Sequence, residues 1–225
     1  MSEFEKSVFS IVQTTAEDKQ IVIEFLRKFF FRDEPLILSI DMLEDIDSLA
    51  KLENYCFQFV DNGLAFKAIS PNGELMGVVL NDLTSKNDRE ENTTTNNGPG
   101  DHTKFNYITT LLDKVEREAD VFSKYPNVDR IMDIKIISVD KSFRGQGVCK
   151  ALIDKTIELA LEKKCPMVYV ECSSYFSAKA AERLGFECIY TLNFRDYVDE
   201  NGEVIFKTSS PHESSKVYVL SLYTH

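Results

Sequence analysis

The feature that most constrains this chain is a strand, a glycine loop and a helix in direct succession between Ile131 and Leu161. Met132 to Val139 has the apolar run of a buried strand, and helical spacing returns at Ile153, Ile157, Ala160 and Leu161. The connection reads Arg144-Gly145-Gln146-Gly147-Val148. Glycines at a helix start leave backbone N–H groups without partners, and these donors, together with the positive helix end, bind phosphate. The loop is therefore predicted to hold a pyrophosphate.

The spacing excludes two common phosphate ligands. The loop lacks the Gly-Lys-Ser/Thr ending of a nucleoside-triphosphate loop and the third glycine of a dinucleotide fingerprint. What remains is Arg-x-x-Gly after a strand that ends in Val139, and it resembles the acetyl-coenzyme A motif of the GCN5-related N-acetyltransferases (GNAT). Cys149 stands where that motif usually has glycine or alanine. A glycine-permitted helix start without a ligand is the alternative.

The resemblance implies a set of residues that bind acetyl-coenzyme A. Backbone amides of the loop would hold the pyrophosphate, and the strand before it would pair with the pantetheine arm. Amides of that strand are also candidates for polarising the thioester carbonyl and stabilising the oxyanion that forms on it. The implied residues are Ile137, Ser138, Val139, Arg144, Gly145, Gln146, Gly147, Val148, Cys149, Lys150 and Ser177.

The composition limits the classes of molecule that the protein is expected to bind. At 225 residues the chain is expected to form one domain, and a hydrophobic content of 43% is ordinary for a soluble protein. The formal net charge of -11 argues against nucleic acid or an anionic membrane, because both would repel the protein. We find neither a signal peptide nor a membrane-spanning run, and we expect a cytoplasmic protein. A monomer is expected, with a dimer as the alternative.

The cysteines and histidines do not predict a metal site. Five cysteines, an odd number at no metal-ligand spacing, are expected to be reduced thiols: Cys56, Cys149, Cys165, Cys172 and Cys188. The three histidines lack a Cys or His partner at ligand spacing. No metal is predicted.

The remaining patterns predict one mixed α/β domain over residues 1–225. A hairpin turns at Pro71-Asn72-Gly73-Glu74, and residues 84–104 are apolar only at Pro99, so we expect a mobile polar loop there. The strand Met132 to Val139 and the strand Met167 to Cys172 are joined by a helical crossover and should be parallel. The resemblance implies that these central strands splay apart within a twisted sheet flanked by helices.

Three further stretches resemble the insect-type arylalkylamine (dopamine) N-acetyltransferases. They are Phe29-Phe30-Phe31-Arg32-Asp33-Glu34-Pro35-Leu36, Ile136-Ile137-Ser138-Val139-Asp140, and Cys172 to Ala178 running into Glu182-Arg183-Leu184-Gly185-Phe186. The first stretch is more specific than the glycine loop. The resemblance covers nearly the whole chain and implies acetyl transfer to a primary amine.

Glu34 is the implied general base. An alkylamine has a pKa of about 10.4, so about one molecule in a thousand is the free nucleophile at neutral pH and a base is needed. The first helix is expected to end at Pro35, which would place Glu34 at its terminus beside three phenylalanines that raise its pKa. A solvated acid that finishes a helix is the alternative interpretation.

Ser173 and Ser177 are the implied proton relay. They lie four residues apart in a predicted helix from Ser173 to Leu184, hence on one face, and Ser177 is the candidate acid for the departing thiolate. Ala181 occupies the position where many acetyltransferases have a tyrosine acid, which leaves Tyr175 as another candidate. Helix capping by Ser173 or Ser174 is the plainer reading.

Phe30, Tyr55 and Asp133 are the candidate substrate contacts. The aromatic rings can hold an aromatic ring or an ammonium group, although such residues are more often plain core. Asp133 falls near the amine pocket by resemblance, but it alternates with Lys135 along one strand, so the two can simply pair.

Three functions remain open. The first is acetylation of an arylalkylamine such as dopamine, serotonin, tyramine, octopamine or tryptamine. The second is the same chemistry on histamine, agmatine or a polyamine, for which Asp133 and the net charge are the only hints. The third is a module that binds acetyl-coenzyme A without turnover.

Overall fold

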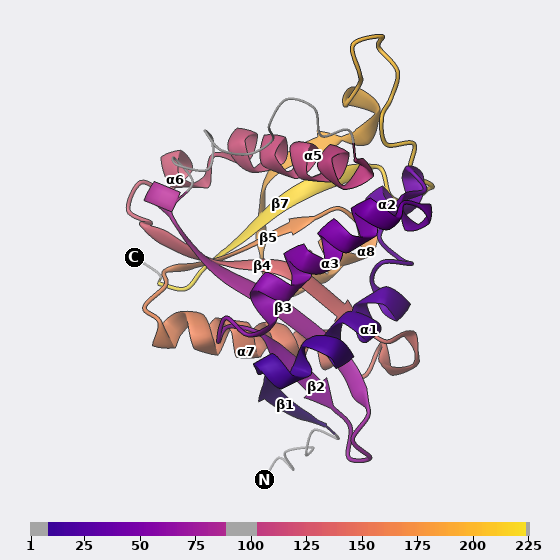
Figure 1. Cartoon of the computed structure of the whole chain (residues 1–225). Helices are drawn as coiled ribbons and strands as arrows, with labels where there is room; N and C mark the ends of the chain where they lie inside the picture. Colours follow the sequence, from indigo (N-terminus) through magenta and orange to yellow (C-terminus); the bar gives the residue numbers. More distant parts are fainter. Residues whose placement is uncertain (1–8, 89–102, 224–225) are drawn as a thin grey trace.

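A computed structural model of the chain describes residues 9–88 and 103–223, and in them seven strands form one sheet in the order β1-β2-β3-β4-β5-β7-β6 (Figure 1). The strands are β1 Ser10–Gln13, β2 Phe66–Ile69, β3 Leu75–Ser85, β4 Arg130–Val139, β5 Met167–Cys172, β6 Glu187–Asn193 and β7 Ser214–Ser221. The α-helices are α1 Lys19–Phe29, α2 Pro35–Ser39, α3 Ile46–Val60, α5 Lys104–Ala119, α6 Val121–Lys124, α7 Val148–Glu162 and α8 Tyr175–Arg183. Short 3-10 turns are η1 Ala16–Asp18, η2 Met42–Glu44, η3 Lys141–Phe143 and η4 Phe194–Asp196. The predicted mixed α/β fold is confirmed.

The sheet is joined at its centre by a short parallel ladder. β4 and β5 are parallel, as predicted, and their register is Met132↔Val168, Asp133↔Tyr169 and Ile134↔Val170. β4 continues to Val139 and β5 to Cys172 without further pairing between them. The implied splay of the two central strands is therefore present. The other ladders between the described strands are antiparallel.

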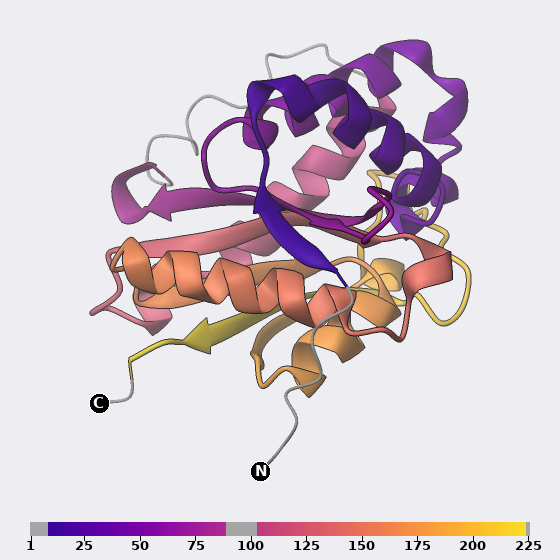
Figure 2. The ribbon, with the colours of Figure 1, turned by 90° about the horizontal axis from the view of Figure 1, so that it is seen from below.

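Helices cover both faces of the sheet. Figure 2 shows α1, α3 and α5 in indigo to pink above the strands, and α7 and α8 in orange below them. One buried cluster joins α1, α3 and α5 to the sheet through residues such as Val22, Leu26, Leu111 and Val115. A second cluster joins α7 and α8 to the other face through Leu152, Ile153, Ala178 and Ala181. Alternate residues of each strand contribute to the two clusters, as the pleat requires.

α7 lies close to the sheet because β3 has a glycine beneath it. A Cβ atom on Gly77 would meet the carbonyl oxygen of Ser138 at 2.9 Å and the side chains of Val148 and Leu152 at 3.2 Å. Only glycine fits this approach. The first turns of α7, and the loop that precedes them, are thereby seated against the end of β4.

Several predicted boundaries are corrected. α1 ends at Phe29, and Pro35 begins α2 instead of ending the first helix. Proline is well tolerated in the first turn of a helix, where its missing N–H has no partner to lose. The predicted helix from Ser173 begins at Tyr175, so Ser173 lies before it. β3 extends through Ser85, so the segment predicted to be polar and mobile starts within a strand. Residues 89–102 of that segment lie outside the described residues.

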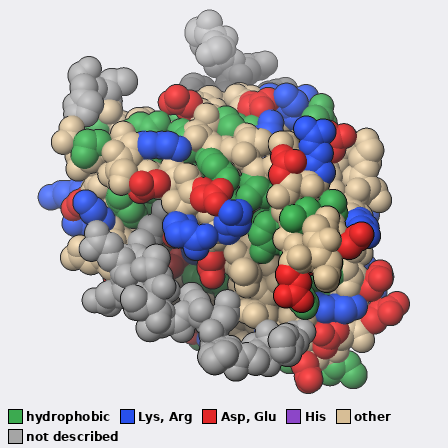
Figure 3. Space-filling model, turned by 90° about the horizontal axis from the view of Figure 1, so that it is seen from above, with side chains coloured by type: hydrophobic (Ala, Val, Ile, Leu, Met, Phe, Trp, Pro, Cys, Tyr) green, Lys and Arg blue, Asp and Glu red, His purple; other side chains and the backbone are tan. Residues whose placement is uncertain are grey.

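The surface carries charges of both signs. Figure 3, seen from above, shows acidic and basic side chains interspersed on that face. None of the helices in residues 9–88 and 103–223 combines the length and the apolarity that a membrane span needs.

Candidate active site

Glu34 lies at the junction of α1 and α2 with its carboxylate held on two sides. Its backbone is extended and it caps α2, because Oε1 accepts a hydrogen bond from the amide of Leu36 at 3.1 Å. Oε2 accepts from the hydroxyl of Ser173 at 3.0 Å. Burial raises the pKa of Glu34 to about 7, although both hydrogen bonds favour the charged form and lower it. A carboxyl with this pKa accepts protons near neutral pH.

Ser173 reaches Glu34 because it follows β5 directly and is not part of α8. Along β5 the odd-numbered side chains Met167 and Tyr169 face the cluster beneath α1 and α3, and Ser173 continues that alternation. The structure thus brings Glu34 and Ser173 together.

Ser177 does not share that position, and the prediction that Ser173 and Ser177 lie on one helical face is wrong. Ser174 is the N-cap of α8, and its hydroxyl accepts from the amide of Ser177 at 3.1 Å. The hydroxyl of Ser177 donates to the carbonyl of Ser174 at 2.9 Å and lies 2.9 Å from its Oγ. The capping interpretation therefore holds for Ser174, whereas Ser173 is left to bond Glu34.

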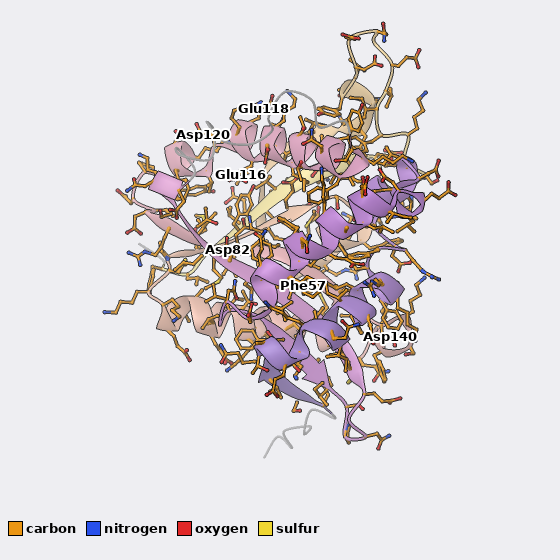
Figure 4. The ribbon with its side chains drawn as sticks, in the orientation of Figure 1. Phe57, Asp82, Glu116, Glu118, Asp120 and Asp140 are labelled. Carbon is orange, nitrogen blue, oxygen red and sulfur yellow. The ribbon has the colours of Figure 1, made fainter. Side chains whose placement is uncertain are left out.

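The loop between β4 and α7 presents a row of backbone donors. Asp140, at the end of β4 (Figure 4), accepts from the amide of Ser142 at 2.9 Å and so starts the turn η3. Gly145 and Gly147 have φ angles of 79° and 82°, a left-handed conformation that favours glycine. Within the described residues, none of the amides from Gly145 to Lys150 donates a backbone hydrogen bond. Unpaired donors at a helix start fit a pyrophosphate.

The side chains of the same loop mostly bond elsewhere. Gln146 donates to the carbonyl of Ser142 at 3.2 Å, and Lys150 pairs with Asp154 at 2.5 Å. Val148 is buried, and burial raises the pKa of the Cys149 thiol to about 11. A ligand at this loop would therefore meet free backbone amides more than free side chains.

Asp33 connects this loop to the turn that carries Glu34. Its two carboxylate oxygens bind Nζ of Lys141 and Nη2 of Arg144, each at 2.8 Å. Partial burial opposes ionisation of Asp33, but the two cations outweigh it and lower its pKa. The phosphate-binding loop and Glu34 are thus joined through adjacent residues of one turn.

The end of β4 directs amides into the space left by the splay. The amide of Asp140 donates to the carbonyl oxygen of Met76, on β3, at 2.9 Å. In an antiparallel ladder, hydrogen-bonded and non-hydrogen-bonded pairs alternate. Because Asp140 is bonded to β3, Ser138 two residues earlier is bonded as well, and the amides of Ile137 and Val139 point away from β3. Two of the three predicted amides therefore face the side where β5 has separated.

Asp133 and Lys135 form a buried ion pair, the plainer of the two readings. Their Oδ2 and Nζ atoms are 2.6 Å apart. Burial opposes the charge of Lys135, but Asp133 outweighs it and raises the pKa of the lysine. Tyr55 packs edge-on against Phe59 with ring centroids 5.0 Å apart, and burial raises its pKa. Phe30 is half-buried and packs against Phe31 with ring centroids 6.0 Å apart, and its carbonyl accepts from the amide of Glu34 at 3.0 Å.

The model of the acetyltransferase (GNAT) family matches residues 47–186. The chain belongs to the GNAT acetyltransferase family. Among solved structures, arylalkylamine N-acetyltransferase 2 from Aedes aegypti is 31% identical with a TM-score of 0.83, over 96% of this chain and 99% of that one. A Drosophila melanogaster polyamine N-acetyltransferase that forms N-acetylagmatine is 24% identical with a TM-score of 0.84, over 95% and 100%. At 24% identity, the likeness to the Drosophila enzyme shows that the two chains share a fold.

The resemblance inferred from the glycine loop and the Phe29 to Leu36 stretch is therefore confirmed. This GNAT protein is an N-acetyltransferase, and acetyl-coenzyme A is its cosubstrate. Its fold shares the insect arylalkylamine enzyme's architecture across nearly all of both chains.

One half-buried acid of this GNAT protein was not predicted from the sequence. Glu171, on β5 two residues before Ser173, accepts a hydrogen bond from the hydroxyl of Ser215 at 2.6 Å. Burial raises its pKa to about 8, and the nearby charge of Glu116 adds to the effect. A single acid inside the apolar run Met167 to Cys172 was the available signal, because unpaired charges are rare in central strands.

The described part of the GNAT chain holds no group of three or more His, Cys, Asp or Glu residues that could bind a metal ion. His212, the one histidine in residues 9–88 and 103–223, accepts from the amide of Tyr175 through Nδ1 at 3.3 Å.

Proposed function

We propose that the protein transfers an acetyl group from acetyl-coenzyme A to the primary amine of an arylalkylamine, with Glu34 as general base. The amines we have in mind are dopamine, serotonin, tyramine, octopamine and tryptamine. The observation that carries the proposal is the enclosed Glu34 carboxylate, which is bonded to Ser173 and has a pKa of about 7. A solvated acid would have neither property.

Glu34 acts on the proton that keeps the amine unreactive. The amine is mostly an ammonium ion at pH 7, with a pKa of about 10.4 in the lysine model. A carboxylate with a pKa of about 7 accepts that proton, directly or through a water molecule, as the nitrogen attacks. The Leu36 amide and the Ser173 hydroxyl hold both oxygens in place.

Residues of the splayed strands and the glycine loop position the acetyl donor. Acetyl-coenzyme A supplies the acetyl group as a thioester. The unpaired amides of Gly145 to Lys150 bind its pyrophosphate, and the amides of Ile137 and Val139 face the pantetheine arm and the thioester carbonyl. Arg144 and Lys141 add positive charge beside the loop. Ser177, whose hydroxyl lies in the first turn of α8, is the proposed proton donor to the departing thiolate.

Two kinds of amine remain as acceptors. The Aedes aegypti enzyme at 31% identity favours an arylalkylamine. The acids near the inner end of the splay, Asp133 and Glu171, favour an amine with a second polar group, such as histamine, agmatine or a polyamine. Residues 1–225 are proposed to work as one domain.

Thiol release from acetyl-coenzyme A with a panel of amines tests the proposal. We expect turnover with arylalkylamines and a slower rate with simple alkylamines. Preference for agmatine or polyamines would favour the second kind of acceptor. No release with any amine would leave a binding module, and the proposed function would be wrong.

A further inference from the structure

The position of Glu171 is set by the point at which the two central strands part. The last pair of the parallel ladder is Ile134↔Val170. The next residues in register, Lys135 on β4 and Glu171 on β5, are opposite each other where pairing stops. Glu171 therefore lies at the apex of the splay.

Glu171 faces the same side of the sheet as the proposed base. Successive side chains of a strand alternate between faces, so Glu171 and Ser173 point the same way. Ser173 in turn bonds Glu34 at 3.0 Å. Two residues of strand rise by about 7 Å, so Glu171 lies about that far from Ser173 along β5, toward the parallel ladder.

One oxygen of Glu171 is fixed and the other is not. Oε1 accepts from the hydroxyl of the fully buried Ser215, on the neighbouring strand β7, at 2.6 Å. Oε2 has no hydrogen-bond partner in the described part of the chain. Glu171 also keeps part of its surface accessible, although burial raises its pKa to about 8. Glu171 is therefore half-buried, with one carboxylate oxygen held and the other available.

The charges around Glu171 favour a ligand group that is a cation or a hydrogen-bond donor. The cation Lys135 is already paired with Asp133 at 2.6 Å. Glu116 lies on the sheet side of α5, whereas Glu118 lies on the opposite side (Figure 4), and the negative charge of Glu116 acts on Glu171. The phenol of Tyr55 lies close to the same ion pair, and Tyr190 of β6 also interacts with Glu171. Two acids, Asp133 and Glu116, and one base, Lys135, surround Glu171, so the site attracts a cation or the positive end of an N–H or O–H group.

We propose that Glu171 is a specificity-determining residue that binds a hydrogen-bond-donating group, a hydroxyl or a cationic nitrogen, at the far end of the acceptor amine. The inference rests on the proposed function, because it assigns the far end of the same acceptor site. Ser215 orients the carboxyl and leaves Oε2 for the substrate. Since Ser173 bonds the proposed base and lies about 7 Å from Glu171 along β5, a span of this order is expected between the reacting nitrogen and the far group, as for a para-hydroxyl on a phenethylamine or the second nitrogen of a short diamine.

Matched pairs of amines test this assignment. Tyramine is compared with phenethylamine, which lacks only the hydroxyl, and 1,4-diaminobutane with butylamine, which lacks only the second nitrogen. For wild type we expect kcat/KM to favour the polar member of at least one pair by about 10-fold or more. The tyramine pair reports recognition of a hydroxyl, and the diamine pair reports recognition of a cation.

Two variants separate recognition from folding. Glu171→Gln keeps the size of the side chain and an acceptor for Ser215, and it removes the carboxyl's ability to ionise when a cation binds beside it. The double variant Glu171→Leu with Ser215→Ala removes the acceptor without leaving the buried hydroxyl unpaired. In the double variant the preference should fall to about 2-fold or less, with the larger loss of kcat/KM for the polar member of the pair. In Glu171→Gln a diamine preference should fall and a tyramine preference should persist.

Three outcomes would overturn the inference. They are the absence of any preference in wild type, an unchanged preference in the double variant, and an equal loss of kcat/KM for both members of a pair, which would indicate a structural role. Turnover of phenethylamine in each case shows that the proposed function survives. If wild type acetylates no amine at all, the proposed function itself fails.

Discussion

The hydroxyl of Ser173 donates to Oε2 of Glu34 at 3.0 Å, although 139 residues separate the two in the chain. The contact joins the end of β5, on one side of the splay, to the cap of α2, on the other. It also favours the charged form of Glu34 and so lowers a pKa that burial has raised. The serine therefore adjusts the pH at which Glu34 can accept a proton.

Substitution of Ser173 should shift the pH dependence of catalysis. Ser173→Ala removes the hydrogen bond that lowers the pKa of Glu34, so that pKa should rise above about 7. The carboxylate is the active form, so the acid limb of the kcat/KM profile should move to higher pH. Ser174→Ala, which changes the helix cap and leaves Glu34 untouched, is the control. An acid limb in the wild-type position would contradict the assigned role.

Removal of the Glu34 carboxylate should slow acetyl transfer without weakening donor binding. Glu34→Ala is expected to lower kcat/KM at pH 7 by about 100-fold or more, since a positioned base contributes about that factor. Affinity for acetyl-coenzyme A, measured by calorimetry, should stay close to wild type because the glycine loop is unchanged. The exposed Glu24 of α1 offers a matched control as Glu24→Ala. A wild-type rate in Glu34→Ala would exclude this glutamate as the base.

The raised pKa of Glu34 should also appear in the stability of the fold. Its pKa rises from 4.5 to about 7, so the folded protein holds the proton more tightly than the unfolded chain. That contribution is complete below about pH 4.5 and is lost as pH rises through about 7, a difference of roughly 3 kcal/mol at most. Glu34→Gln should therefore exceed wild type in free energy of unfolding at pH 8 and match it more closely at pH 5. Urea titrations at both pH values measure this, and a pH-independent difference would count against the burial of the charge.

The glycine loop allows a test of charge at constant shape. Gly147→Asp places a negative charge where the pyrophosphate is proposed to bind, and Gly147→Asn is the neutral control of the same size. Both tolerate the positive φ of 82° better than other side chains do. The Asp variant should bind acetyl-coenzyme A at least 10-fold more weakly than the Asn variant. Equal affinities of the two variants in calorimetry would place the pyrophosphate elsewhere.

The strand, glycine loop and helix could be predicted because each step has a local cause. An apolar run predicts β4, and helical spacing predicts α7. The positive φ angles between them occur at Gly145 and Gly147. Each of these signals depends only on neighbouring residues. The strand Met167–Cys172 was predicted with the observed bounds for the same reason.

The errors arose where one residue type has two roles. Proline at position 35 is compatible with the end of one helix or the start of the next, and only the packing of α1 and α2 decides for the second. Two adjacent serines can each cap a helix, and the sequence does not separate Ser173 from Ser174. Glu171 was missed because its partner Ser215 is brought near by the pairing of β5 with β7, far along the chain.

The parallel ladder of three residue pairs between β4 and β5 is a seam, and the strands on its two sides carry different functional residues. On one side are the strands β1 to β4, and the glycine loop follows the last of them. On the other side are β5, β7 and β6, with Glu171, Ser173 and Ser215. The glycine loop and Glu171, proposed to bind the two substrates, therefore lie on different sides of this seam. Substitutions around Glu171 and Ser215 can therefore change the preferred amine while the glycine loop continues to bind coenzyme A.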